Sequence, residues 1–276
     1  MSAPSSRVKS AHAVRSPVLA CLPCVALMAG CGKSGENARR GEPLRVAAAA
    51  DLAIAFKDVG LEFEKTSGKR VEFSFGSTGL MAKQLEEGAP FDVFAAANVS
   101  FADDVVKAGA CLGDTKQLYA KGRIVIWSKD EASLPKSLDD LAQPRYAKIA
   151  IANPDHAPYG KAAQQALTKK GVWDAAKPRA VYGENVQQTL MFAQTGNADV
   201  AIVALSLAVT SGGHWVMIDP ELHEPLDQAM VVCKGGTKGA KANEARSFVE
   251  FVSSPAGRAI MRKYGFLLPG ETPPKP

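Results

Sequence analysis

The chain has 276 residues, of which 46% are hydrophobic and 22% charged, so it is large and apolar enough to fill the cores of two lobes and is not a disordered chain. Three of its 33 basic residues, Arg7, Lys9 and Arg15, lie in the first thirty positions, where there is no acidic residue. The other 30 basic residues face 28 acidic ones, and this nearly neutral balance gives no electrostatic reason to bind nucleic acid.

The first thirty residues have the pattern of a secretory signal peptide. An apolar run too short to span a bilayer follows the basic residues and ends in small residues directly before Cys31. The local sequence LMAGC resembles the lipobox of bacterial lipoproteins, in which the cysteine is acylated and becomes the first residue. We therefore expect residues 1–30 to be a lipoprotein-type signal peptide, Cys31 to carry the lipid and residues 31–43 to form a flexible tether. The alternative is an ordinary signal peptide with a soluble periplasmic product.

Two cysteines, Cys111 and Cys233, remain once the signal peptide and the lipid-bearing cysteine are set aside. A disulfide between them is chemically possible outside the cytoplasm. Positions so far apart in the sequence carry no information about proximity in the fold, and we expect two separate small buried residues.

From position 44 onward, short apolar runs alternate with amphipathic stretches, a pattern typical of strands joined by crossover helices. The first strand is expected at 44–49, and a helix at 51–66 because apolar residues recur there at spacings of four, three and four. Alternation of apolar and polar residues predicts a second strand at 71–75. The further expected elements are a helix from the GSTG turn to 87, strands at 92–96, 123–127, 148–152, 179–182, 200–203 and 227–232, and two helices between 240 and 264 broken at Ser254-Pro255.

Two extended runs, 118–128 and 227–234, contain no crossover helix of their own, and we expect them to connect two lobes. The fold class is then α/β, with mostly parallel sheets flanked by helices and a two-strand hinge. Lobe one is expected to comprise 42–124 plus 229–276, and lobe two 125–228. Two lobes joined in this way form a cleft that can close by hinge bending.

Four turns share one arrangement, in which a strand runs into small or polar residues and a helix then begins. They are Ala49-Ala50-Asp51-Leu52, Gly76-Ser77-Thr78-Gly79, Ala157-Pro158-Tyr159-Gly160 and Gly183-Glu184-Asn185-Val186. The first amides of a helix are unpaired and partly positive, so each turn is suited to hold an anion. Any one of them alone is more often a simple cap or turn. Facing one another across a cleft, the four would surround a small oxyanion with neutral donors.

Five segments of the chain match one family in order: VAAAADL, SFGSTGLMAKQLEEGAPFDVFAAA, ANPDHAPYGKAAQQAL, GVWDAAKPRAVYGENVQQTL and SPAGRAIMRKYGF. On these segments the chain resembles the periplasmic molybdate-binding proteins. The resemblance implies a type II periplasmic binding protein fold, with molybdate or tungstate enclosed between the lobes and no cofactor. It also implies delivery of the ion to an ABC transporter permease with a cytoplasmic ATPase. A periplasmic monomer without enzymatic activity, held at the membrane only by its lipid, is expected.

The resemblance also implies which residues bind the oxyanion. Carried over by motif, they are Ala50, Asp51, Ser77, Thr78, Tyr159 and Val186. Thr78, with Ser77 beside it, falls on a hydroxyl donor of the family, and Tyr159 and Val186 fall on backbone donors. Molybdenum would be held only as molybdate, through its oxygens.

Asp51 departs from the family, in which many relatives have serine or asparagine at this position. An ionised carboxylate would repel the dianion by about 4 kcal/mol per pair of unit charges at 4 Å. We expect Asp51 to cap the following helix with its side chain turned away from the ion. Ala204 stands where some relatives have a tyrosine that donates to the ion, and the Tyr159 hydroxyl is a candidate replacement.

Two other classes of function stay open. A binding protein for sulfate, phosphate or an organic anion would use the same cleft. An enzyme is disfavoured because Ser77 and Thr78 lie in no nucleophile elbow and have no obvious histidine partner. His214 and His223 show no ligand spacing with each other or with cysteine, which argues against a transition-metal cation site. The sequence contains no P-loop, so ATP hydrolysis would belong to another subunit.

Overall fold

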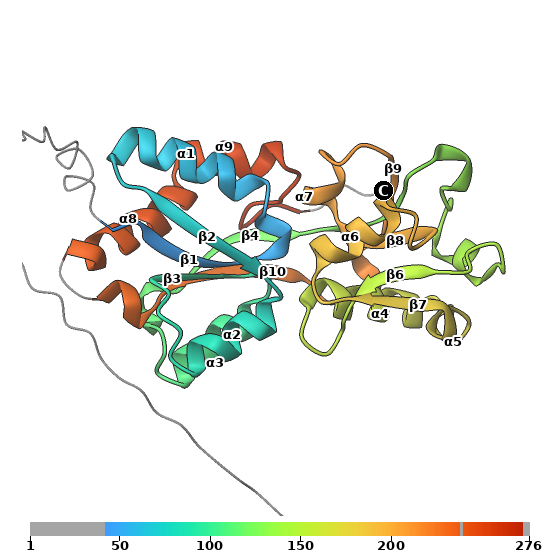
Figure 1. The fold of residues 1–276 in the computed structure, drawn as a ribbon, viewed down its shortest axis with the longest axis horizontal. Coiled ribbons are helices and arrows are strands. Elements are labelled where there is room, and N and C mark those ends of the chain that lie inside the picture. The colour runs from blue at the N-terminus through green and yellow to red at the C-terminus, as the bar shows by residue number, and fades with distance from the viewer. Residues whose placement is uncertain (1–41, 238–239, 273–276) are drawn as a thin grey trace, which may run out of the picture. The chain divides into compact units, whose positions relative to one another are not determined.

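The computed structural model describes residues 42–237 and 240–272, which form two five-stranded sheets with helices on both faces (Figure 1). The predicted signal peptide, Cys31 and most of the predicted tether lie outside the described residues. Within these two ranges, no helix combines the length and the apolar character that crossing a membrane requires.

The first sheet has the strand order β2-β1-β3-β10-β4. β1 pairs in parallel with β2 and β3, whereas β10 runs antiparallel to β3 and β4. One face is covered by α1, α8 and α9, and the other by α2 and α3 (Figure 1). The strands are β1 (Leu44–Ala49), β2 (Val71–Gly76), β3 (Val93–Ala96), β4 (Gln117–Gly122) and β10 (Leu226–Val232), and the helices are α1 (Ala55–Ser67), α2 (Thr78–Glu86), α3 (Val99–Lys107), α8 (Ala240–Ser253) and α9 (Pro255–Lys263).

The second sheet has the strand order β7-β6-β8-β5-β9. β6 pairs in parallel with β7 and β8, and β5 runs antiparallel to β8 and β9. Helices α4 and α5 lie on one face and α6 and α7 on the other (Figure 1). The strands are β5 (Ile124–Ser128), β6 (Ile149–Ala152), β7 (Ala180–Gly183), β8 (Val200–Ala204) and β9 (His214–Met217), and the helices are α4 (Pro158–Lys169), α5 (Trp173–Ala176), α6 (Val186–Gln194) and α7 (Leu205–Ala208).

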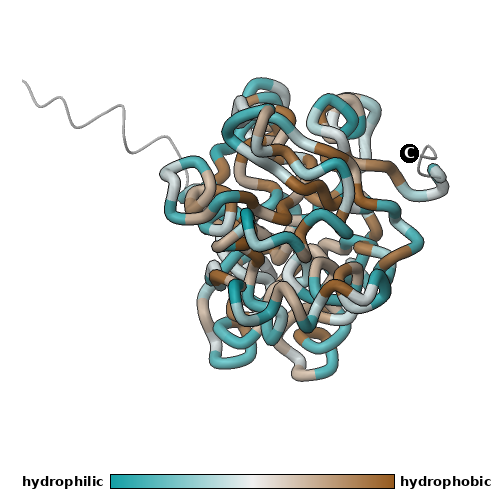
Figure 2. Tube along the Cα trace, turned by 90° about the vertical axis from the view of Figure 1, so that its right-hand side faces the viewer, coloured by the Kyte–Doolittle hydropathy of each residue, from teal (hydrophilic) through white to brown (hydrophobic). Residues whose placement is uncertain are grey.

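Helix α1 shows how the sequence pattern becomes packing. Its apolar residues at helical spacing are buried against the first sheet and the C-terminal helices, where the rings of Phe56 and Phe63 meet Phe248 edge-on at centroid distances of 6.1 and 5.3 Å. The helix ends at Gly68, whose φ of 70° is the left-handed conformation that glycine adopts without steric cost. Hydrophobic segments accordingly run through the interior, while hydrophilic residues gather on the outer turns (Figure 2).

The expected α/β fold with two lobes and mostly parallel sheets is confirmed, and one antiparallel strand makes each sheet mixed. Each contains one strand that runs against its neighbours, β10 in the first sheet and β5 in the second. Each of these two strands is the first one after the chain crosses from one sheet to the other. The chain crosses at Arg123, before β5, and again between β9 and β10. The extended run expected at 118–128 is therefore two strands in two sheets. The sequence did not predict β9, which has only four residues, the first two of them exposed.

The expectation of two separate cysteines is wrong, because Cys111 and Cys233 form a disulfide. They face each other in an isolated antiparallel bridge, one just beyond α3 and the other just beyond β10. Strand β10 inserts beside β3, the strand that leads into α3, so the end of β10 meets the chain as it leaves that helix. This pairing depends on where β10 lies after the chain has built the second sheet, which no local pattern encodes.

Candidate functional site

One small cavity lies where the four predicted turns meet. Its walls include all six predicted site residues, Ala50, Asp51, Ser77, Thr78, Tyr159 and Val186, together with Ala49, Gly76, Ala97, Ala157, Pro158 and Asn185. The turns follow the carboxyl ends of β1 and β2 in one sheet and of β6 and β7 in the other. The space open to the centre of a water molecule is about 10 Å³, which is far too small for an organic ligand of ordinary size.

Three helices point unpaired amides toward this cavity from their first turns. Thr78 and Val186 are the first residues of α2 and α6, and Tyr159 is the second residue of α4. No described residue accepts a hydrogen bond from the backbone N–H of any of the three. Asn185 caps α6 through the amides of the two residues after Val186, at 3.0 Å each, so the Val186 amide itself stays available. These amides are the partly positive groups that hold anions at helix N-termini.

The hydroxyl of Thr78 adds a side-chain donor. Its Oγ1 accepts a hydrogen bond from the Ala97 amide nitrogen at 3.3 Å, within a site where Thr78 is 1% exposed. Among the described residues no acceptor takes the hydroxyl proton, which leaves it free for an atom inside the cavity.

Ser77, in contrast, is already satisfied by the other lobe. Its Oγ lies 2.8 Å from the His156 carbonyl oxygen, which can only accept, so Ser77 donates its proton there. His156 Nδ1 lies 2.8 Å from the same Oγ and must therefore be the donor in that contact. The Gly79 amide also donates to the His156 carbonyl, at 2.9 Å. The Ser77 hydrogen bond thus links the start of α2 to the turn before α4.

Asp51 does not cap the helix that follows it, and that expectation is wrong. It lies within a 3-10 turn, Ala50–Leu52, whose N-cap is Ala49 and which has no side-chain cap. The Asp51 side chain is buried, and its Oδ2 accepts hydrogen bonds from the Tyr159 hydroxyl at 2.9 Å and from Gln228 Nε2 at 2.6 Å. The hypothesis that the Tyr159 hydroxyl replaces the family tyrosine at the ion is therefore also wrong, because its proton goes to Asp51.

The buried carboxyl of Asp51 perturbs its surroundings. Burial raises the pKa of Asp51 from 3.8 to about 6, although the hydrogen bonds from Gln228 and Tyr159 work in the opposite direction. Burial, reinforced by the charge of Asp51, also raises the pKa of Tyr159 and of Tyr119 well above 10. Both phenols are consequently neutral at physiological pH.

The comparisons with known proteins agree with this geometry. The sequence profile of the family described as bacterial extracellular solute-binding protein matches residues 44–267. The molybdate-binding protein ModA of Azotobacter vinelandii is 34% identical over 83% of this chain and 91% of its own length. The chain belongs to the ModA family of bacterial extracellular solute-binding proteins. This is a family of binding proteins and not of enzymes.

Further members support the assignment. ModA of Rhodobacter capsulatus is 34% identical over 80% of this chain and 86% of its own length. A putative ABC transporter substrate-binding lipoprotein of Bacillus subtilis, YvgL, is 29% identical over 90% of this chain and 96% of its own length. The solved structure of the A. vinelandii periplasmic molybdate-binding protein matches with a TM-score of 0.75 and 30% identity, over 82% of this chain and 99% of that one.

Two residues that contact Asp51, Gln228 and Ser206, were not predicted from the sequence. Gln228 is fully buried in β10, directly before the apolar residues 229–232, and a glutamine at this place in a strand was a signal for a buried polar contact. Ser206 donates its hydroxyl to the Asp51 carbonyl oxygen at 2.8 Å, and it stands in a short helix of the other lobe where no pattern marks it.

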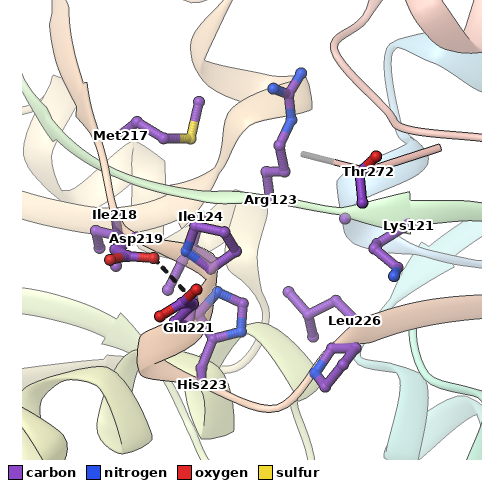
Figure 3. A pocket seen from close by; sticks show the side chains of 13 residues that line it. Lys121, Arg123, Ile124, Met217, Ile218, Asp219, Glu221, His223, Leu226 and Thr272 are labelled. Atoms are coloured by element: carbon purple, nitrogen blue, oxygen red, sulfur yellow. Dashed lines mark hydrogen bonds between the residues drawn. The ribbon is translucent and has the colours of Figure 1, made fainter. Parts of the chain in front are cut away.

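A second, larger cavity of about 440 Å³ lies at the two connections between the sheets (Figure 3). Its side chains include Asp219 and Glu221, and Asp219 Oδ1 accepts a hydrogen bond from the Glu221 amide at 2.9 Å. Its cations are engaged, since Lys121 pairs with Asp227 and Arg123 donates to the Gly265 carbonyl. Two carboxylates without a free cation make this cavity unsuitable for a dianion. The described residues contain no group of three or more acidic, histidine or cysteine side chains that could hold a metal cation.

Proposed function

We propose that this chain binds molybdate or tungstate between its lobes and delivers the ion to the permease of an ABC transporter. The observation that carries the proposal is the convergence of unpaired helix amides from both lobes, with the free Thr78 hydroxyl, on one small cavity. Neutral N–H and O–H donors stabilise a fully deprotonated tetrahedral anion. The two ModA relatives named above are molybdate-binding proteins, and the transporter would supply the ATPase.

The residues around the cavity have different roles. The amides of Thr78, Tyr159 and Val186 and the hydroxyl of Thr78 bind the ion's oxygens. Ala50 and Asp51 form the wall of the cavity at the end of β1, and Ser77 holds the lobes together around it. The protein contacts only oxygens, so no residue ligates molybdenum itself. We propose that closure brings together lobe one, 42–124 plus 229–276, and lobe two, 125–228. The first residues of β10, Leu226 to Gln228, pair in the first sheet, so lobe one takes these three residues as well.

The chain would work as a lipoprotein on the periplasmic side of the membrane, anchored through Cys31. Two observations support a lipid anchor: the LMAGC sequence that ends at Cys31, and the similarity to the putative substrate-binding lipoprotein YvgL. The alternative, a soluble periplasmic protein, is distinguished by fractionation. Cys31→Ala should move the protein from the membrane to the soluble fraction, and an unchanged distribution would argue against the lipid.

The choice of anion is tested by calorimetric titration of the purified domain with molybdate, tungstate, sulfate and phosphate. We expect molybdate and tungstate to bind more tightly than sulfate. Sulfate has the same charge and shape but shorter bonds, so donors set around the larger ion cannot all reach its oxygens. Sulfate binding as tight as molybdate binding would favour the alternative of a general oxyanion-binding protein.

The role of Thr78 is tested in the same titration. Thr78→Ala should weaken molybdate binding by about 1–3 kcal/mol, or about fivefold to 150-fold, because one ligand oxygen loses its partner in a buried site. Thr78→Ser, which keeps the hydroxyl, is the matched control and should bind nearly as the parent does. Unchanged affinity in Thr78→Ala would remove this hydroxyl from the site.

A further inference from the structure

The buried side chains of Asp51, Tyr159 and Gln228, which form a polar cluster beside the cavity, have fewer hydrogen-bond donors than acceptors. The three donor hydrogens of this cluster are all used: the Tyr159 hydroxyl donates to Asp51 Oδ2, and Gln228 Nε2 donates to Asp51 Oδ2 and, at 3.2 Å, to the Tyr159 oxygen. Two buried acceptors, Asp51 Oδ1 and Gln228 Oε1, are left without any partner among the described residues. A buried acceptor without a donor is costly. One added proton on the Asp51 carboxyl would convert one of these orphaned acceptors into a donor.

Among the residues that the structure describes, no cation pairs with the Asp51 carboxyl. Helices α6 and α7, which pack on the 3-10 turn of Asp51, carry no titratable side chain, and β2 carries only Glu72, which is exposed. The charge of Asp51 acts on two titratable groups, the neutral phenols of Tyr119 and Tyr159. The cations on the other adjoining segments are engaged elsewhere: Lys121 with Asp227, Lys161 with Glu224, and Arg123 with the Gly265 carbonyl.

Groups from both lobes bury this carboxyl. Asp51 belongs to the turn after β1, and the groups that enclose it come from both sides of the cleft: Tyr159 and Ser206 from the second lobe and Gln228 from β10. Asp51 is 1% exposed in this arrangement, and it also lines the ion cavity. A closed form that contained both the dianion and an ionised Asp51 would place three negative charges together in a buried, cation-free site.

We propose that capture of the oxyanion is coupled to the uptake of one proton, which the Asp51 carboxyl carries in the closed, liganded form. This inference rests on the proposed function, because the charge of the ligand is part of the argument. With lobes open, Asp51 meets water and keeps its ordinary pKa near 3.8, whereas burial in the closed form raises the pKa to about 6. The dianion raises it further.

The sign of the linkage follows from this difference. Since closure raises the pKa of Asp51, the closed form binds more protons than the open form above pH 4. Affinity for the oxyanion therefore increases as pH falls toward about 4, and it decreases as pH rises through the pKa of the closed, liganded form. A transporter built on this protein would capture its ion more tightly in acidic surroundings.

Proton uptake is measured by titrating the protein with molybdate at pH 6 in several buffers of different ionisation enthalpy. The slope of the observed enthalpy against the buffer enthalpy gives the number of protons taken up. We expect about 0.5 to 1 proton per ion, because Asp51 is almost fully ionised in the open form and at least half protonated in the closed form at this pH.

Two variants assign the proton to Asp51. Asp51→Asn, which has the same shape without the charge, should bind with uptake near zero at pH 6 and about tenfold or more tightly than the parent at pH 8, where the parent must first acquire a proton. Glu72→Gln removes the exposed carboxylate of β2 and should leave both affinity and uptake as in the parent. Any proton uptake that is common to the parent and to Asp51→Asn cancels in the difference, so the difference isolates Asp51.

The outcomes separate this inference from the function on which it rests. Binding by the parent without proton uptake would overturn the inference and leave the proposed function standing, and this result needs no variant to fold. Equal uptake by the parent and Asp51→Asn would also overturn it. If none of the four oxyanions binds to the parent, the proposed function and the proton linkage both fall.

Discussion

Gly79→Val is expected to weaken molybdate binding by about 100-fold or more while both lobes stay folded. A Cβ atom at Gly79 would lie 2.7 Å from the His156 carbonyl oxygen and 3.1 Å from its Cα, so the obstacle is the backbone of the opposite lobe. Overpacking of a tight contact costs about 1–3 kcal/mol or more, and here opening of the lobes relieves it. The penalty therefore falls on the closed, ligand-binding form.

The effect should grow with the size of the side chain, so Gly79→Ala should lose about tenfold in calorimetric affinity and Gly79→Val more. Gln84→Val, on the exposed side of the same helix, is the control for a β-branched residue in α2 and should bind as the parent does. Thermal unfolding without ligand should be close to that of the parent in all three. Full affinity in Gly79→Val would mean that the ion is bound without the contact between α2 and the turn at His156.

Removal of the disulfide is expected to lower the free energy of unfolding by about 3–4 kcal/mol. The bridge joins Cys111 and Cys233 across 122 positions of sequence and so restricts a large part of the unfolded chain. It also ties the end of β10, a strand that enters from the other lobe, to the chain leaving α3. The double variant Cys111→Ala/Cys233→Ala, unfolded in denaturant, gives the measurement.

The parent protein unfolded with a reductant present is the reference for that experiment and should lose a similar amount of stability. Single variants leave one free thiol and should match the double variant. A loss below about 1 kcal/mol in the double variant would show that the bridge contributes little beyond the hydrogen bonds around it.

The turns of the site could be predicted because their signals are local. A strand that ends in small residues before an amphipathic stretch is visible at Gly76-Ser77 and at Asn185-Val186, and the first amides of a helix are unpaired wherever the helix lies. That the four turns share one cavity follows from the doubly wound arrangement, in which the carboxyl ends of parallel strands lie at one edge of each sheet.

What the sequence could not supply depends on pairings across long distances in the chain. Asp51 meets Gln228 only because β10 returns to the first sheet, and the same return brings Cys233 to Cys111. The capping role expected for Asp51 was inferred from its local sequence alone. In the structure its carboxylate instead accepts a hydrogen bond from the Tyr159 hydroxyl of the opposite lobe. Similarly, Ser77 is a typical cap by sequence, yet its hydroxyl is used by His156.

One oxyanion should be bound between the lobes by donors from both of them. Crystals grown with molybdate, with diffraction data recorded at the molybdenum absorption edge, would show where the ion lies. We predict a single strong anomalous peak in the cavity lined by Thr78, Tyr159 and Val186, with the lobes closed and Asp51 still in contact with Tyr159. A peak outside this cavity, or bound molybdate that contacts one lobe only, would contradict binding by donors from both lobes.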